Sequence, residues 1–469
     1  MTGPRILPVP GGTSPGAVAM AYASLHKLVE LHEERTTDPG HPAPHTVVVL
    51  RDPATVDRAT LRGSAATPLQ AFPTLAPDTA TDPHLLDGID VVIQTSGSST
   101  GHPHLVGLSV GALIASARST DQALAGPGRW ILALPAHHVA GAQVLFRAAL
   151  AATSPQIVDT TAGFHPTRLP AAVAGATQDP DLPGYLSLVP TQLRACLEAG
   201  PEVTAALARL AAVLVGGSGA DPALLGRARE LGIRVHTTYG MTETAGGCVY
   251  DGRPLPGVAV RTVEVDGRAR LAVAGPMLMT RYLDGPSPFI DEGGVRWLLT
   301  GDIGRVTPAG CVEVLGRSDD VIVSGGLSVA PGPVRRAVLA TPGVSDAWIL
   351  DVPDEKWGAL VTAAVVPEPG VLAVTDAGGA ALVPDPVPPT PAGPAATPDP
   401  ATAPAPAPGL RELALAIREH VGESLGRAEA PRVVVALDSL PMLPTGKVDP
   451  RALRAAVEER IGTGAEWRR

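Results

Sequence analysis

The sequence predicts an α/β protein with a large N-terminal domain of mixed and parallel sheets with helices, a small β subdomain within it, and a small α+β C-terminal domain. Three observations lead to this fold class. Short apolar runs alternate with segments of helical spacing between residues 46 and 240. Two alternating runs then flank an Asp-Gly pair, and a second series of strands and helices begins after Gly316. Alternation of this kind implies a sheet with helices on its faces.

The first series supplies the main sheet of the predicted N-terminal domain. Its strands are the apolar runs 46–50, 90–94, 130–134, 185–189, 211–217 and 233–240. Its helices are the segments 109–124, 138–151, 190–199 and 221–231, which carry apolar residues at helical spacing. Because helical segments separate several of the strands, we expect a parallel or mixed sheet.

The pattern changes over about residues 247–315. Residues 258–275, VAVRTVEVDGRARLAVAG, form two alternating runs around Asp266-Gly267, a pair that favours a tight hairpin turn. We therefore expect a small antiparallel β subdomain here, within an N-terminal domain of residues 1–316.

The C-terminal domain is predicted to comprise residues 317–469, with its boundary near 317–319. Its expected elements are a strand 320–323, a helix 331–340, strands 344–351 and 359–366, a helix 409–420, a strand 432–437 and a helix 451–460. Residues 367–408 interrupt this series with 13 prolines among mostly Ala, Thr, Val and Asp. Such a composition cannot form a packed core, so we expect a disordered insertion without a catalytic role.

Composition and charge exclude several classes of function. The 469 residues are 45% hydrophobic and 17% charged, and their net charge of −10 argues against nucleic acid or an anionic membrane as the main partner. We find neither a signal-peptide pattern at the N-terminus nor an apolar run long enough for a membrane span. Cys196, Cys248 and Cys311 lie far apart and form no CxxC pair, so buried thiols in a reducing cytoplasm are expected.

The first chemistry-bearing stretch is VVIQTSGSSTGHPHLVGLS at residues 91–109. An apolar strand leads into Ser, Thr and Gly residues, and a helical segment follows. Hydroxyls and glycine amides beside a helix start can donate several hydrogen bonds to phosphate oxygens. No lysine follows a glycine as in a P-loop, and His102 and His104 stand in the loop instead. A turn without any ligand is the alternative.

Two acidic residues stand in the next two stretches. Glu243 lies in HTTYGMTETAGG at 236–247, where a carboxylate could hold Mg²⁺ beside a triphosphate, since Mg²⁺ uses few protein carboxylates. A helix N-cap at this place is the alternative. Asp302 lies in LLTGDIGRV at 298–306, and its carboxylate could accept hydrogen bonds from a ribose diol. A plain Asp-containing turn is the alternative here.

Basic residues mark the last two stretches. Arg317 opens GRSDDVIVSGGLSVAP at 316–331, in which a short strand leads to Gly325-Gly326. Lys447 lies on a glycine turn in LPTGKVDP at 443–450 and is one of only three lysines in the chain. A solvated surface lysine is the alternative for Lys447.

The five stretches occur together in the order of the signature motifs of the adenylate-forming superfamily. The chain resembles this family, which comprises acyl-CoA and aryl-CoA ligases, luciferases and the adenylation domains of peptide synthetases. The resemblance extends from Thr95 to Lys447 and implies ATP, Mg²⁺ and the co-substrate CoA. Glycine-rich dinucleotide binding is excluded for the VGGSGA run at 215–220, because its GxGxxG pattern is incomplete.

The resemblance also implies roles for individual residues. Tyr239 is expected against the adenine, Thr242 near the phosphates and Glu243 on Mg²⁺, while Asp302 and Arg317 bind the ribose. The expected nucleotide- and CoA-binding residues are Thr95, Ser96, Gly97, Ser98, Ser99, Thr100, Gly101, Gly216, Gly217, Ser218, Tyr239, Gly240, Asp302, Arg317, Gly325 and Gly326.

In this family a lysine of the small C-terminal domain supplies the charge for adenylation, and Lys447 matches it. That domain then turns about a hinge, here at Asp319, and the loop with Gly325-Gly326 enters beside the CoA thiol. The chain departs from the family in one loop. His104 and Leu105 stand where Lys and Gly are usual, and one extra Ser or Thr is present, so His104 is expected to replace the lysine in part.

Within the family, the chain most resembles o-succinylbenzoate–CoA ligases of the actinobacterial type (MenE). A short region before Thr95 and the stretches 133–145, 187–193 and 239–258 carry this resemblance. It implies that His138 lies at the acyl pocket and counts among the catalytic residues with Lys447, Glu243 and Thr242. Candidates for holding the second carboxylate of the acid are His138, Ser187 and Thr191. A metal site at His137-His138 is not expected, because no third ligand lies at a zinc spacing.

The implied function is therefore an ATP-dependent ligase of menaquinone biosynthesis that adenylates o-succinylbenzoate and transfers the acyl group to CoA. Three alternatives stay open. The chain could act on another aryl or short-chain acid, it could stop at the adenylate, or it could be a degenerate paralogue that only binds nucleotide. Neither nucleic acid nor a membrane span is expected, and a homodimer stays open.

Overall fold

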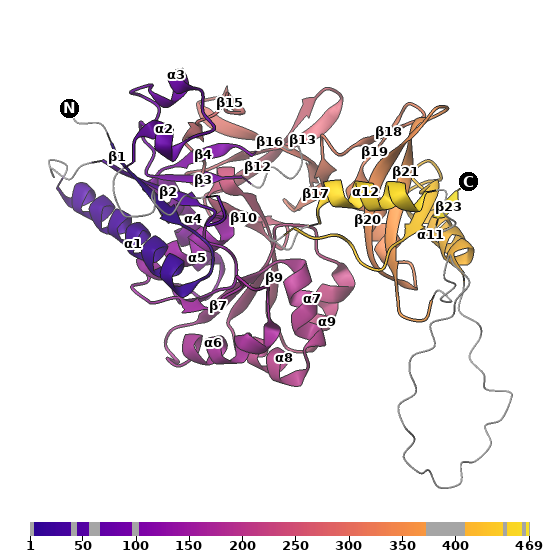
Figure 1. The fold of residues 1–469 in the computed structure, drawn as a ribbon, viewed down its shortest axis with the longest axis horizontal. Coiled ribbons are helices and arrows are strands. Elements are labelled where there is room, and N and C mark those ends of the chain that lie inside the picture. The colour runs from indigo at the N-terminus through magenta and orange to yellow at the C-terminus, as the bar shows by residue number, and fades with distance from the viewer. Residues whose placement is uncertain are drawn as a thin grey trace, which may run out of the picture. The chain divides into compact units, whose positions relative to one another are not determined.

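The computed structural model describes residues 4–38, 45–55, 66–95, 103–371, 409–443, 448–461 and 466–468. The chain divides after Asp319 into two compact units, and the second unit extends over Asp320–Pro441 and continues from Val448. The fold is mixed α/β, as the sequence predicts (Figure 1). In the described part of the chain, no helix combines the length and apolarity that a membrane crossing needs.

The first sheet of the larger unit begins with three parallel strands. Its order is β1 (Arg5–Pro10), β2 (Thr46–Arg51), β3 (Val91–Gln94), β4 (Leu105–Leu108) and β14 (Arg281–Tyr282). The last two strands are antiparallel to their neighbours, with Tyr282 opposite Val106. Two short helices, α2 (Pro68–Ala71) and α3 (Pro77–Ala80), belong to the same region.

The sequence analysis missed β1 and the helix that follows it, α1 (Pro15–Thr37). Two prolines, Pro8 and Pro10, argue against a strand in the run RILPVP. The strand forms nevertheless because β1 is at the edge of its sheet, where β2 is its partner strand and its other side makes only a single bridge, between Ile6 and Ala66. A proline is tolerated there, since an edge strand leaves part of its N–H groups without a ladder partner.

The second sheet is parallel over most of its width. Its order is β11 (Arg253–Pro254), β10 (Gly246–Tyr250), β9 (Val235–Met241), β8 (Ala212–Val215), β7 (Gly184–Leu188), β5 (Arg129–Leu132) and β6 (Gln156–Ile157). Strands β5 to β9 pair in parallel, as expected from the helices between them.

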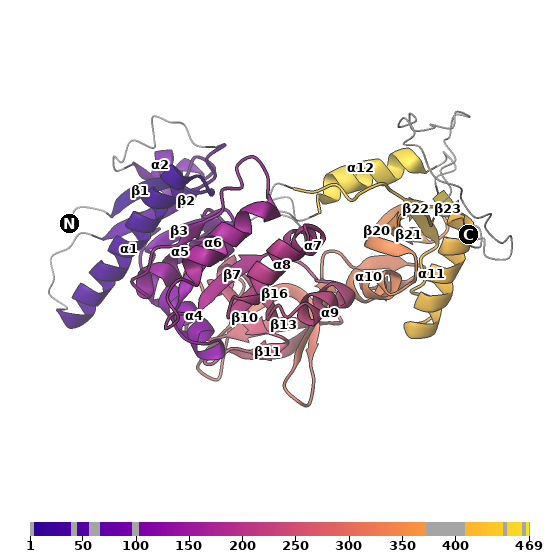
Figure 2. The same ribbon diagram turned by 90° about the horizontal axis from the view of Figure 1, so that it is seen from below.

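Helices cover both faces of this sheet. The two helices α4 (Val110–Ala123) and α5 (Val139–Leu150) share one core with α1 and with strands of both sheets, including the buried Trp130 and Tyr185. The opposite face packs against α6 (Leu169–Ala176), α7 (Pro190–Glu198), α8 (Pro201–Ala208) and α9 (Pro222–Glu230), which are labelled in Figure 2. A single 3₁₀ turn, η1 (Pro166–Arg168), precedes α6. The sequence does not predict α6 and α8. The four predicted helices of this domain are present as α4, α5, α7 and α9.

The third sheet of the larger unit is antiparallel and confirms the predicted hairpin. It contains β12 (Ala259–Val265), β13 (Arg268–Ala274), β16 (Val295–Val306), β15 (Phe289–Glu292) and β17 (Val312–Arg317). Asp266 and Gly267 both have positive φ, 52° and 70°, which is the conformation of a type I′ hairpin turn. Aspartate and glycine are suited to this turn because they adopt positive φ at low cost.

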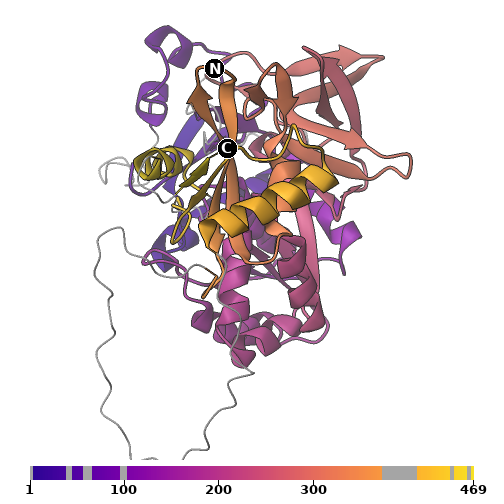
Figure 3. The same ribbon diagram turned by 90° about the vertical axis from the view of Figure 1, so that its right-hand side faces the viewer.

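The second unit is a four-stranded sheet between helices (Figure 3). Its strands are β20 (Val344–Asp354), β21 (Gly358–Pro367), β22 (Val433–Ala436) and β23 (Glu466–Arg468), in that order. One face packs against α10 (Pro331–Leu339) and α11 (Leu410–Ser424), and the other against α12 (Pro450–Arg460).

A separate hairpin corrects the single strand predicted at 320–323. The segment forms β18 (Ile322–Ser324) and β19 (Leu327–Val329), which pair across Gly325 and Gly326. Both glycines have positive φ, 59° and 82°, which side chains rarely adopt. Most of the proline-rich insertion, residues 372–408, lies outside the described residues, so its expected disorder stays a prediction.

Thiol labelling at pH 8 should modify Cys311 rapidly, and Cys196 and Cys248 only on unfolding. Cys196 and Cys248 are 0% and 1% exposed, whereas Cys311 is partly exposed. Burial raises the pKa of both buried thiols to about 12, and the thiolate is the reactive form. Mass spectrometry of labelled peptides measures the outcome, with Cys311→Ser as the control. Rapid labelling of a buried thiol in the folded protein would contradict the described core.

Candidate nucleotide and metal site

A partly buried hydrogen bond joins two of the predicted site residues. The Tyr239 hydroxyl on β9 donates to Asp302 Oδ2 on β16 over 2.7 Å. The two strands belong to different sheets, so this bond connects the second and third sheets of the larger unit. Strand pairing places Arg317 of β17 opposite Asp302, and its Nη1 lies 3.7 Å from Asp302 Oδ1. The structure thus brings together three residues that lie far apart in the sequence.

The environment of Asp302 has opposing effects on its charge. Burial is the largest influence and raises the pKa of the Asp302 carboxyl, while the Tyr239 hydrogen bond and the nearby Arg317 act to lower it. Burial also raises the pKa of Tyr239, so its phenol keeps its proton and acts as the donor. Arg317 in turn donates from Nε to Asp319 Oδ1 over 3.1 Å. The site therefore presents carboxylate acceptors and a guanidinium side by side.

The space at this place is limited, as Gly301 indicates. A Cβ atom on Gly301 would lie 2.6 Å from Nη2 of Arg317. Any side chain at residue 301 would therefore displace the guanidinium from Asp302. The sequence analysis did not single out Gly301, and its position directly before Asp302 is the only sequence signal for its role.

Glu243 lies on a short turn between two strands of the second sheet. Thr242–Thr244 form a single 3₁₀ turn, η2, and β10 begins at Gly246, so the helix N-cap alternative is wrong. Ala245 ends the turn in the left-handed conformation with φ 49°. Its carbonyl accepts hydrogen bonds from Ser116 Oγ and Gln143 Nε2, both buried.

The same turn depends on a close approach between backbones. Gly240 ends β9 so close to Gly246 that a Cβ atom on Gly240 would lie 2.1 Å from the Gly246 carbonyl oxygen. Thr242 is buried, whereas Glu243 is only partly buried. The turn therefore fixes the backbone and leaves the Glu243 carboxylate accessible to a ligand.

Tyr282 is a contact of Glu243 that the sequence analysis missed. The Tyr282 hydroxyl donates to Glu243 Oε1 over 2.6 Å. Burial, and secondarily the Glu243 carboxylate, raise the pKa of Tyr282 well above its ordinary value, which keeps the phenol a donor. Only the pairing of β14 with β4 brings Tyr282 to this place. No local pattern around residue 282 signals the contact.

A Mg²⁺ ion at Glu243 would fit the donor set. Within the described ranges, no group of three or more His, Cys, Asp or Glu side chains could hold a metal ion. A metal bound here would therefore rely on Glu243 together with ligands that the protein does not supply. Mg²⁺ is commonly held in this way, by one or two carboxylates, phosphate oxygens and water.

The predicted phosphate loop is described only at its base. Thr95 donates from its N–H to the His104 carbonyl over 2.9 Å, and its Oγ1 accepts from the His104 N–H over 2.8 Å. These two bonds close the loop between β3 and β4. Ser96, Gly97, Ser98, Ser99, Thr100 and Gly101 lie outside the described residues, as does Lys447.

The VGGSGA run follows β8 at the carboxyl edge of the parallel strands. Gly216 lies so close to Thr238 of β9 that a Cβ atom would be 2.1 Å from Thr238 Oγ1. Gly217 has a φ of 83°, and Gly217 and Ser218 are exposed. Ligands of α/β sheets bind at the carboxyl ends of the strands, which agrees with the expected adenine position.

The predicted acyl-pocket residues follow neighbouring strands of the same sheet. His138 comes after β5 and is the N-cap residue of α5, with its ring 4.4 Å from that of His137. Ser187 lies in β7, and Thr191 in the first turn of α7 directly after it. Since β5 and β7 are adjacent and parallel, these residues gather at the carboxyl edge of the sheet. Gly325 and Gly326 belong to the second unit.

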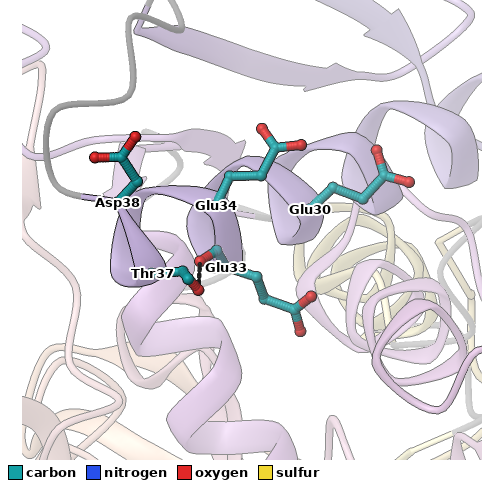
Figure 4. Close-up of a pocket in the computed structure, with 5 residues that line it drawn as sticks. All are labelled: Glu30, Glu33, Glu34, Thr37 and Asp38. Atoms are coloured by element: carbon teal, nitrogen blue, oxygen red, sulfur yellow. Dashed lines mark hydrogen bonds between the residues drawn. The ribbon is translucent and has the colours of Figure 1, made fainter.

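A hollow on the surface of α1 is a separate feature (Figure 4). It is lined by Glu30, Glu33, Glu34, Thr37 and Asp38. Four of these five residues are acidic, so the hollow repels phosphate. None of the predicted site residues lines it.

Comparisons with known proteins agree with the expected family. Residues 16–283 match the family described as AMP-binding enzyme. A probable 2-succinylbenzoate–CoA ligase of Mycobacterium tuberculosis is 36% identical over 384 residues, which cover 81% of this chain and 86% of the relative. The 2-succinylbenzoate–CoA ligase of Lactococcus lactis is 29% identical over 283 residues, which cover 57% of this chain and 58% of the relative.

Solved structures share the fold. ATP-bound MatB from Rhodopseudomonas palustris has a TM-score of 0.66 at 21% identity, over 98% of this chain and 90% of its own. The o-succinylbenzoate CoA synthetase MenE from Bacillus subtilis, in complex with the acyl-adenylate OSB-AMP, has a TM-score of 0.60 at 21% identity. The match covers 97% of this chain and 95% of the MenE chain. At this level of identity the likeness concerns the fold alone.

Asp302→Asn should stabilise the folded protein at pH 7 and weaken the binding of AMP by about tenfold or more. Because burial raises the pKa of Asp302, the carboxyl group keeps its proton to a higher pH in the folded state than in the unfolded state. The free energy of unfolding of the wild type therefore falls as the pH rises through the folded pKa, and asparagine removes that loss. The stability gain should be smaller at pH 4 than at pH 7, because the wild-type carboxyl takes up its proton as the pH falls through the folded pKa.

Urea unfolding at both pH values and calorimetric titration with AMP measure the two effects. Asp319→Asn is the control, since it also removes a carboxylate beside Arg317 but from a more exposed place. A destabilised Asp302→Asn variant at pH 7 would contradict the assigned cause of the shift.

Proposed function

Because the chain belongs to the family of AMP-binding enzymes, we propose that it is an AMP-forming acid–CoA ligase whose acid is o-succinylbenzoate. The observation that carries the proposal is the convergence of Tyr239 and Arg317 on the buried carboxylate of Asp302. This cluster offers an aromatic ring, a carboxylate and a guanidinium to one nucleoside. The choice of acid is supported by the 36% identity to the mycobacterial 2-succinylbenzoate–CoA ligase.

The reaction has two steps. First, the carboxylate of the acid attacks the α-phosphorus of ATP. The bond from this phosphorus to the oxygen that bridges it to the β-phosphorus breaks, so that the acyl-adenylate forms and pyrophosphate leaves. Second, the thiol of CoA loses its proton and attacks the acyl carbon, and AMP leaves from the thioester. The product is the precursor thioester of menaquinone biosynthesis.

Residues of the larger unit would hold the nucleotide. Asp302 accepts from the ribose hydroxyls beside Arg317, and Tyr239 lies against the adenine. The backbone of Gly216, Gly217 and Ser218 lines the same base, and Gly240 keeps the backbone compact there. The loop Thr95–Gly101 and Thr242 donate hydrogen bonds to the phosphates.

A Mg²⁺ ion at Glu243 would neutralise phosphate charge when it is bound. Negative charge also concentrates as the acid carboxylate meets the α-phosphate, and Lys447 supplies a cation there. Preorganised charge of this kind stabilises a transition state by roughly 2.7–4 kcal/mol. His138 lies at the acyl pocket, where Ser187 and Thr191 are the other candidates for the second carboxylate of the acid.

The two steps would use two arrangements of the chain. We assign nucleotide binding, including the contact of Arg317, to the part before the expected hinge at Asp319 and the motion to the part after it, with the insertion 367–408 playing no catalytic role. Lys447 acts in the first step, and Gly325 and Gly326 admit the pantetheine of CoA in the second. The free cysteines fit a reducing cytoplasm, and a homodimer is compatible with this scheme.

The choice of substrate is tested by pyrophosphate release from ATP with a panel of acids. We expect kcat/KM for o-succinylbenzoate to exceed that for benzoate or hexanoate by about 10² or more, because an acid without the second carboxylate leaves a polar contact unmade. Mass spectrometry with and without CoA then separates thioester from adenylate. Equal turnover of benzoate would contradict the assigned acid, and adenylate as the final product in the presence of CoA would contradict the ligase.

Lys447→Ala should separate the two steps. Adenylation should fall by about 10² to 10³, the usual loss for one transition-state donor. Thioester formation from preformed acyl-adenylate should stay near the wild-type rate, because Lys447 acts only before the C-terminal part turns. Two assays on each variant measure this: pyrophosphate release, and thioester formation from the adenylate.

Gly326→Trp is the matched variant, expected to show the reverse pattern. Equal losses in both assays for Lys447→Ala would refute the alternation of the two parts. Near-normal adenylation by Lys447→Ala would refute the role assigned to this lysine.

A further inference from the structure

Tyr282 connects the Glu243 turn to the strand that follows the phosphate loop. Its hydroxyl donates to Glu243 Oε1 over 2.6 Å, and its backbone pairs with Val106 of β4. The Met279 N–H donates to the Glu243 carbonyl over 2.8 Å, so the segment before Tyr282 also contacts this turn. Tyr282 therefore holds the side chain of Glu243, while the adjoining backbone holds its main chain.

His104 stacks on the Tyr282 ring. The two ring centroids are 4.4 Å apart and the rings are nearly parallel, at 16°. His104 Nδ1 lies 3.3 Å from Asp284 Oδ1. Since Tyr282 pairs with Val106 in an antiparallel ladder, extending the register by two residues places His104 opposite Asp284. Strand register thus determines both contacts of the imidazole.

His104 also closes the base of the phosphate loop, because its backbone forms two hydrogen bonds with Thr95. One residue therefore connects this loop, through stacking on Tyr282, to the carboxylate of Glu243. In the sequence analysis His104 was expected to replace a phosphate-binding lysine in part. The described contacts of its ring are instead with Tyr282 and Asp284.

We propose that Tyr282 is a positioning residue for the metal-binding carboxylate of Glu243, and that the His104–Asp284 pair holds the Tyr282 ring in place. This inference rests on the proposed function, which assigns Mg²⁺ to Glu243. A carboxylate that accepts a hydrogen bond on Oε1 loses rotational freedom, and its other oxygen is presented in one orientation. A hydrogen bond to a charged acceptor is strong enough for this, since it is worth more than a bond between neutral groups.

The test is calorimetric titration of the full-length protein with ATP, in MgCl₂ and in EDTA, without any acid. Tyr282→Phe removes the hydroxyl and keeps the ring. We expect the Mg²⁺ concentration for half-maximal enhancement of ATP binding to rise about tenfold, the size expected for one charge-assisted hydrogen bond. ATP affinity in EDTA should stay within about twofold of the wild type. Tyr250→Phe is the control, because its hydroxyl bonds Thr120 in the core.

Two variants of His104 test the stacking separately. His104→Ala should shift the Mg²⁺ dependence in the same direction as Tyr282→Phe, whereas His104→Phe, which keeps a stacking ring, should restore most of the wild-type behaviour. In a Glu243→Gln background, Tyr282→Phe should add no further loss, because the two residues act through one carboxylate. Thermal unfolding of each variant confirms that it is folded.

An unchanged Mg²⁺ dependence in Tyr282→Phe, or an equal loss of ATP affinity in MgCl₂ and EDTA, would overturn the inference and leave the proposed function standing. A further loss in the Glu243→Gln background would overturn it as well. A wild type whose ATP binding does not respond to Mg²⁺ would overturn both the inference and the proposed metal site.

Discussion

The bond between Tyr239 and Asp302 is the interaction on which the rest of the site depends. It joins β9 of the parallel sheet to β16 of the antiparallel sheet, so the two sheets share this polar contact. An unpaired carboxylate at this depth would cost several kcal/mol, which the phenol and Arg317 offset only in part. The proposed nucleotide site therefore lies where the protein already has to satisfy a buried carboxylate.

Near that bond, the chain passes so close to its neighbours that three positions accept only glycine without a shift of the surrounding atoms. Gly216, Gly240 and Gly301 each occupy a place where a Cβ atom would meet another group at 2.1–2.6 Å. Ala245 adopts a left-handed conformation that is costly for alanine, and Ser116 and Gln143 hold its carbonyl. This strained residue lies two positions after Glu243, the carboxylate to which the proposed mechanism assigns Mg²⁺.

Most of the fold could be predicted from the sequence, because long apolar runs and helical spacing are local signals. The parallel strands, the Asp266-Gly267 hairpin and most of the helices follow from such signals. The edge strand β1 could not be predicted, since its prolines are tolerated only because of the position of β1 in the sheet. The β18–β19 hairpin was missed because each of its strands has only three residues.

The residues of the candidate site also divide into those with a local sequence signal and those without one. Glu243, Asp302 and Arg317 stand in motifs and could be named in advance, whereas Tyr282 reaches Glu243 only through the pairing of two distant strands. A short strand of two residues carries no periodicity that a sequence could display. Contacts of this kind become visible only once the register of the sheet is known.

The position of Arg317 also links binding to the division of the chain. The first continuous stretch of the larger unit ends at Asp319, two residues after Arg317, and Arg317 donates to Asp319 itself. Two residues span at most about 7 Å, so the guanidinium lies close to the boundary, while strand pairing holds Arg317 opposite Asp302. If the boundary is the hinge of the proposed mechanism, then a ribose held by Asp302 and Arg317 lies next to the pivot. The nucleotide can then stay bound while the C-terminal part exchanges one catalytic surface for the other.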